Sequence, residues 1–250
     1  MNIFFFAAAG SIAQLIDGVL GMGFGVTSTS LMIALGANAV VASTAVHVAE
    51  IGTTLASGTA HWRADNVNVA VLKRIAIPGG IGAFAGATFL SSINLDTSKV
   101  FISFLLLTLG FVLLYRNLFV KPREIRAGAE RAKMLPYLGL VGGFIDASGG
   151  GGWGPVVTPT LMAANTAQPR KIIGTVSAAE FVVAVSATLG FLANSGRIDV
   201  DWRIVGALAI GGILTAPLAA HISRKMPVHK FGIIVAVAII VINLRTILVA

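Results

Sequence analysis

Long runs of apolar residues, separated by short polar segments, make up most of the chain. The printed sequence contains eight of them, and six have the length of a single helix. The runs cover residues 3–35, 38–60, 70–92, 99–119, 134–165, 171–194, 203–222 and 228–249. A helix of about 20 residues crosses the hydrocarbon core of a bilayer. The pattern therefore predicts an all-α polytopic membrane protein.

The first and fifth runs are too long for one straight span, and each has glycines at its centre. Residues 21–25 read Gly-Met-Gly-Phe-Gly, and residues 149–154 read Gly-Gly-Gly-Gly-Trp-Gly. Glycine is unfavourable inside a helix, so we expect each run to break into two half-helices around a loop. Unwound backbone at membrane depth persists only where protein buries it or where it lines a wet cavity.

The two glycine-rich segments belong to an internal repeat. Asp17 and Asp146 precede them at matching positions, and the pattern Gly-x-Gly-aromatic-Gly recurs in register. Further along, Glu50 matches Glu180. We therefore predict two homologous repeats of four segments each, residues 1–119 and 134–250. A basic cytoplasmic linker, residues 120–133, joins them.

The distribution of positive charge favours an inverted arrangement of the repeats. Lys and Arg accumulate on the cytoplasmic side of membrane proteins. If all eight runs cross, the two sides hold 12 and 6 Lys/Arg, whereas re-entrant hairpins at runs one and five give 14 and 4. The hairpin model separates charge better and leaves three crossings per repeat, an odd number that inverts the second repeat. Inverted repeats with broken helices are typical of transporters.

Composition narrows the class of protein further. Only 11% of residues are charged and 56% are hydrophobic, whereas soluble domains carry about 25% charged residues. An ordinary soluble enzyme is therefore excluded, and the absence of cysteine removes thiol nucleophiles and thiolate metal sites. The net charge of +8 arises mainly from the basic run Arg116 to Lys133 and nearby loops. We interpret it as a topology signal and not as nucleic-acid binding.

The start of the chain, residues 1–3, lacks the basic region of a signal peptide. We interpret it as the beginning of the first membrane segment.

The motifs resemble a known family. Asp17 with Gly21-x-Gly23-Phe24-Gly25, and the second copy from Gly139 to Pro155, are similar to the sulfite exporter TauE/SafE family, also called TSUP permeases. The resemblance covers nearly the whole chain, including its two halves. It implies a multi-pass protein of the cell (inner) membrane that transports small sulfur-containing anions such as sulfite or organosulfonates.

Four of the ten acidic residues lie inside apolar runs: Asp17, Glu50, Asp146 and Glu180. One charge at the bilayer centre costs about 2.5–3.5 kcal/mol, so four unpaired charges would cost roughly 10–14 kcal/mol. We predict that these residues, with His47 one helical turn before Glu50, form a proton relay or gate. Two alternatives stay open: the aspartates can tie down the loops by accepting N–H bonds, and His47 can be a packing residue.

The loops themselves suit an anion. A half-helix N-terminus offers free N–H groups and the positive end of the helix dipole. We predict that the loops and nearby hydroxyls bind the substrate through Gly21, Gly23, Phe24, Gly25, Ser28, Thr44, Gly150, Gly152, Trp153, Gly154, Thr175 and Ser177. As an alternative, the glycines permit close helix crossings. The rings of Phe24 and Trp153 either gate the cavity or pack as wedges in the core.

These features together predict an anion permease that exports its substrate down the membrane potential, with or without proton coupling. No enzyme activity or cofactor is expected. We predict no metal site either, because Ser177 replaces His47 in the second repeat. A cation permease and a membrane assembly factor are the alternatives. The predicted partners are the lipid bilayer and a small anion, and homo-oligomerisation stays open.

Overall fold

The computed structural model describes residues 3–20, 22–119, 133–163, 169–194, 201–223 and 228–249. Gly21 and residues 120–132 of the predicted linker lie outside this part. The regular elements of the described residues are α-helices, which confirms the predicted fold class. Their bounds are α1 Ile3–Leu20, α2 Phe24–Ala34, α3 Ala39–Arg63, α4 Val69–Ser92, α5 Leu95–Phe119, α6 Leu135–Gly149, α7 Trp153–Ala163, α8 Pro169–Ala193, α9 Trp202–Ser223 and α10 Val228–Val249.

Several helices have the length and apolar composition of membrane spans. Within the described residues, five meet both requirements: α3, α4, α5, α8 and α10. Helix α9 contributes the shorter apolar stretch Trp202–Thr215. Because a span needs about 20 apolar residues, these helices support a multi-pass arrangement.

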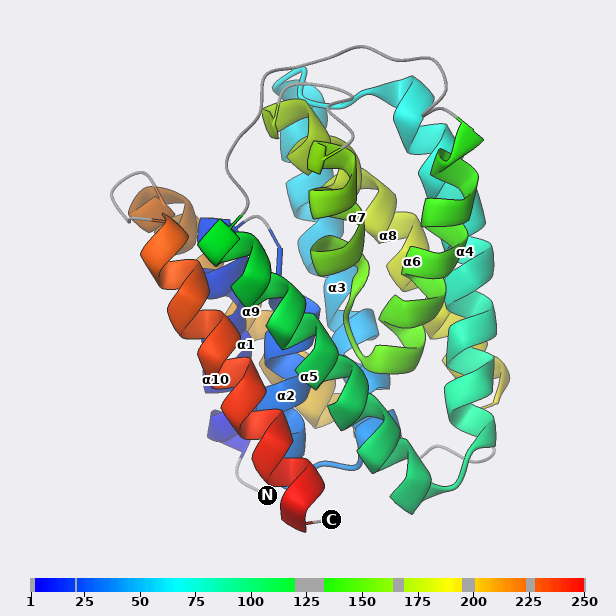
Figure 1. Ribbon diagram of the computed structural model, residues 1–250, viewed down its shortest axis with the longest axis vertical. Coiled ribbons are helices and arrows are strands. Elements are labelled where there is room, and N and C mark those ends of the chain that lie inside the picture. Colours follow the sequence, from blue (N-terminus) through cyan, green and yellow to red (C-terminus); the bar gives the residue numbers. More distant parts are fainter. Residues whose placement is uncertain are drawn as a thin grey trace.

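Both long apolar runs break at their glycines, as predicted. The first run forms α1 and α2, and the fifth forms α6 and α7. Gly23, Gly150 and Gly151 have φ angles of 123°, 73° and 126°, which glycine adopts without a Cβ clash. In Figure 1, α6 runs down from the top of the molecule and α7 returns towards it, so this run forms a hairpin.

The long helices begin at residues that favour a helix start. The side chain of Asn38 accepts hydrogen bonds from the first N–H groups of α3, and Asn68 does the same for α4. In the second half, Asp201 accepts from the N–H of Arg203 at the start of α9. Such caps satisfy donors that have no partner inside the helix.

The most extensive helix contacts join the two halves of the chain. Helix α4 packs on α6, and α1 packs on α9. The pairs α3–α8 and α5–α10 also make large contacts, and Figure 1 shows α5 and α10 side by side. Exchanging each helix for its predicted repeat partner converts α4–α6 into α1–α9 and leaves α3–α8 and α5–α10 unchanged, whereas the large contact α4–α8 is converted into the smaller contact α3–α9. The repeat and its inversion stay predictions.

Glycines allow these cross-repeat helices to approach closely. A Cβ atom added to Gly82 of α4 would lie 2.9 Å from the carbonyl carbon of Leu140 in α6. A Cβ atom added to Gly143 of α6 would lie 2.8 Å from the carbonyl carbon of Gly79 in α4. In membranes, helices associate through such close backbone packing. Gly79 and Gly82 therefore permit a close crossing of α4 and α6.

Replacing Gly143 by leucine tests this packing. The side chain would meet the α4 backbone, so we expect a loss of stability of at least about 1–3 kcal/mol, the usual cost of overpacking. Thermal unfolding in detergent measures it. Val141→Leu is the matched control, because Val141 lies on the same helix and is 52% exposed. Equal melting temperatures for the two variants would show that the α4–α6 contact does not limit stability.

Candidate functional site

The two glycine-rich loops meet inside the molecule. A Cβ on Gly25 would lie 2.6 Å from the Cα of Gly151, which places the first turn of α2 directly on the loop before α7. The Thr29 hydroxyl donates a hydrogen bond to the Gly150 carbonyl. The two loops therefore converge on one central place, and the contact depends on glycine at both positions.

Each aspartate lies beside the half-helix that follows it. Oδ1 of Asp146 accepts hydrogen bonds from the N–H groups of Gly152 at 2.7 Å and Trp153 at 2.9 Å. Asp17 accepts from the N–H of Phe24, which follows it by seven residues, as Trp153 follows Asp146. Asp146 thus caps the N-terminus of α7, as the alternative interpretation of the aspartates requires, and Asp17 interacts with the corresponding N–H at the start of α2.

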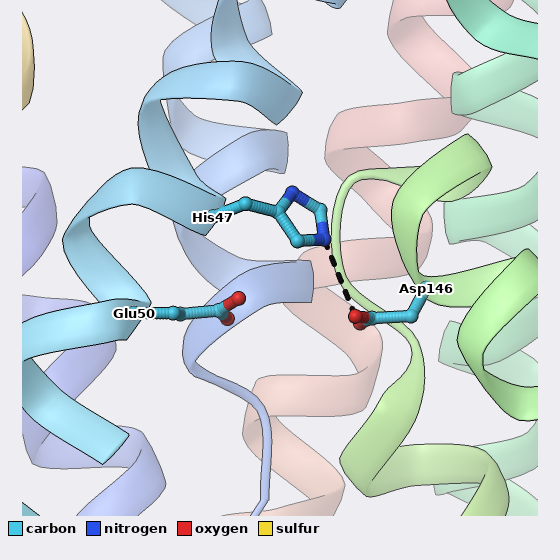
Figure 2. Close-up of side chains that lie close together, drawn as sticks. All are labelled: His47, Glu50 and Asp146. Carbon is cyan, nitrogen blue, oxygen red and sulfur yellow. Dashed lines mark hydrogen bonds and ion pairs between the residues drawn. The ribbon is translucent and has the colours of Figure 1, made fainter. Parts of the chain in front are cut away.

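Asp146 also contacts His47, as Figure 2 shows. The imidazole Nε2 lies 3.2 Å from Oδ2 of Asp146, and Nδ1 lies 2.7 Å from the Ser43 carbonyl oxygen. A carbonyl only accepts, so Nδ1 carries a hydrogen and a neutral imidazole would turn a lone pair towards the carboxylate. A proton between Nε2 and Oδ2 would make this contact a hydrogen bond and would leave the pair without net charge.

Glu50 completes this cluster. Its side chain is 2% exposed, Oε2 has no hydrogen-bond partner, and a Cβ on Gly25 would lie 2.9 Å from Oε1. The ligand atoms of His47, Glu50 and Asp146 all lie within 4.8 Å of one another, so they can share a bound cation such as a proton or a metal ion. Asp146 joins His47 and Glu50 from the other half of the chain, whereas the expectation of no metal site considered only ligands within one repeat.

All four intramembrane acids interact electrostatically. Glu50 experiences the charges of Asp146, Glu180 and Asp17, and Glu180 those of Asp17 and Asp146. The structure therefore brings the predicted proton-relay residues into one group around the loops.

The predicted hydroxyl ligands separate into two kinds. Ser28 is fully buried and its hydroxyl has no partner; the same holds for the hydroxyl of its neighbour Thr27, which is 5% exposed. By contrast, Thr44 donates to the carbonyl of Val40, and Thr175 donates to Lys171 and accepts from the N–H of Asn68. Ser177 is half-buried. Thr27 and Ser28 are thus the hydroxyls with unused capacity beside the loops.

The two aromatic residues of the loops pack in the core. A Cβ on Gly79 would lie 2.8 Å from the Trp153 ring, and one on Gly212 would lie 3.2 Å from the Phe24 ring. The indole N–H of Trp153 donates to the carbonyl of Val176 at 3.1 Å. Both rings therefore act as wedges between helices of opposite halves, which is the second of the two interpretations above.

Comparison with known proteins identifies the family. The model of the sulfite exporter TauE/SafE family matches residues 6–246. The chain belongs to this family. The probable membrane transporter protein YtnM of Bacillus subtilis (strain 168) is 48% identical over 246 residues, which are 97% of this chain and 82% of that protein. The resemblance seen in the glycine motifs is confirmed, and this TauE/SafE protein is a multi-pass membrane transporter and not an enzyme.

One residue of this TauE/SafE protein gains a significance that the sequence analysis missed. Arg116, assigned there to the basic topology run, lies in the last turn of α5 and is half-buried. Its guanidinium contacts the sulfur of Met22, which follows Gly21 in the first loop. The available signal was its position inside the apolar run 99–119.

Substitution of Asp146 tests its capping role. Asp146→Ala removes the acceptor for two N–H groups at the start of α7, so we expect a loss of about 1–2 kcal/mol, as for other helix caps. Asp146→Asn keeps one side-chain oxygen as an acceptor and should lose less stability than Asp146→Ala. Melting temperatures in detergent measure both, and equal losses would contradict a capping role for this side chain.

Proposed function

We propose that this TauE/SafE transporter exports a small sulfur-containing anion, sulfite or an organosulfonate, past the contact of its two glycine-rich loops. The observation that supports this most directly is the meeting of α2 and α7 at Gly25 and Gly151. The first N–H groups of a helix have no partner within it, and the dipole makes that end positive. The unpartnered hydroxyls of Thr27 and Ser28 add donors that a sulfur oxyanion accepts.

The aspartates limit where the anion can bind. Asp146 already accepts two N–H groups at the start of α7, whereas Asp17 engages one at the start of α2. Two unpartnered hydroxyls follow on α2, Thr27 and Ser28, against one on α7, Thr158, so the beginning of α2 offers more free donors. We therefore place the substrate on the α2 side of the contact, next to Gly25.

An anion at this place lies near four carboxyl groups, so its charge must be compensated. We propose that His47 and Asp146 share one proton and form a pair without net charge, which leaves Glu50 and Glu180 to be compensated. We propose that both glutamates hold protons while the anion is bound. The groups that face Glu50 are His47 on its own helix, Asp146 on α6, and the charges of Asp17 and Glu180. Among them His47 alone is a base that can carry positive charge, so protons supply the rest of the compensation.

The membrane potential then drives export. A potential of 100 mV, negative inside, is worth about 2.3 kcal/mol per charge, so a departing dianion gains about 4.6 kcal/mol. The gain persists as long as fewer protons accompany the anion than it has charges. In the predicted inverted topology, rocking of the helix pairs α4–α6 and α1–α9 would alternate access.

The same carboxylate cluster supports a second candidate, a cation permease. The shared site of His47, Glu50 and Asp146 is the specific observation that favours it. The two candidates differ in which ion moves.

Flux in proteoliposomes distinguishes the two candidates. With an imposed potential, positive on the side to which the anion moves, we expect sulfite or a sulfonate to cross faster than in protein-free vesicles, at a rate that rises with the potential. Absence of flux for sulfite and for every sulfonate would reject the substrate class. Uptake of sodium, potassium or divalent cations in the same vesicles would favour the cation permease.

The double variant Glu50→Gln/Glu180→Gln tests proton coupling. Glutamine mimics a permanently protonated glutamate without exchanging a proton, so we expect the flux of wild type to increase as pH falls and the flux of the variant to lose that dependence. Glu50→Gln alone should retain part of it. The same pH profile for wild type and double variant would exclude the relay.

A further inference from the structure

We propose that Arg116 is the binding residue for the oxyanion group of the substrate as it approaches the glycine-rich loops. The inference rests on the proposed anion export and names the cation that the loops themselves lack.

The position of Arg116 connects it to both hairpins. The side chain extends from the last turn of α5. Its Nη1 contacts the Sδ of Met22, in the loop between α1 and α2, and its Nη2 lies 3.7 Å from the Sδ of Met162, near the end of α7. The guanidinium therefore lies between the first glycine-rich loop and the half-helix that begins at the second.

The contacts of this guanidinium leave its hydrogen-bonding capacity largely unused. A guanidinium has five N–H donors, and a thioether sulfur is a weak acceptor. Among the described residues, the ion pair within 4.0 Å joins His47 to Asp146, and Arg116 has no carboxylate partner. An anionic ligand that reaches this half-buried guanidinium gains from both charge and hydrogen bonds.

The chemistry of the ligand follows from the guanidinium. Its planar fork binds two oxygens of one group at once, as in carboxylate and phosphate recognition. Sulfite and sulfonates present such pairs of oxygens. Weak sulfur contacts are easily displaced, which allows the ligand to arrive and leave. The phosphate of an anionic lipid has the same chemistry, so the experiment must separate the two sources.

Transport kinetics test the proposal directly. For Arg116→Gln we expect the KM for sulfite to rise about 10–100-fold, the effect of losing charge-assisted hydrogen bonds, with a much smaller change in maximal rate. Arg116→Lys keeps the charge without the planar fork, so its KM should lie between those of wild type and Arg116→Gln. Arg74→Gln is the matched control, because Arg74 is an exposed cation on a helix of the same chain. A KM for Arg116→Gln equal to that of wild type overturns the proposal.

A binding measurement separates this proposal from the proposed function. In detergent, sulfite and sulfate should raise the melting temperature of wild type but not that of Arg116→Gln, whose melting temperature without ligand reports its folding. This result would stand even if wild type carried no flux. If phosphatidylglycerol raises the melting temperature and no inorganic oxyanion does, the guanidinium binds a lipid headgroup and the proposal is wrong.

Discussion

Backbone groups that leave a helix at membrane depth must find partners inside the protein, and the architecture of this transporter depends on how that requirement is met. Asp146 accepts the two N–H groups where α7 begins, and Asp17 accepts the N–H of Phe24 where α2 begins. A Thr29 hydroxyl bonds one carbonyl of the second loop. Lipid offers no hydrogen-bond partners to these backbone groups, whereas the carboxylates do. They thus stabilise the broken helices and allow unwound backbone at the centre of the protein.

Close packing then decides which polar groups meet around that centre. Gly25 and Gly151 bring the loops into backbone contact, and glycines on α4 and α6 bring helices of opposite halves together. This packing brings α3 and α6 together from opposite halves of the chain. His47 therefore reaches Asp146, and Glu50 lies beside both. The capping carboxylate is therefore also part of the charged cluster.

Local patterns predicted much of the fold and part of the site. The breaks at residues 21–25 and 149–154 followed from glycine content and run length, and the aspartate caps were one of two interpretations of the repeat. The roles of Thr44 and Thr175 could not be predicted, because a threonine on a helix can bond its own preceding turn, as both do. The choice between gate and wedge for Phe24 and Trp153 could not be made either, because it depends on glycines of other helices.

The sequence by itself determined the all-α class, the apolar runs, the two broken segments, the family and the four intramembrane acids. Hydropathy and helical period are properties of neighbouring residues, so a single chain segment carries them. The tertiary structure decided that the loops touch, that His47 pairs with Asp146 across 99 positions, and that Arg116 contacts Met22. Those contacts depend on how closely helices distant in sequence can approach, and that distance is set by the small residues of both partners together.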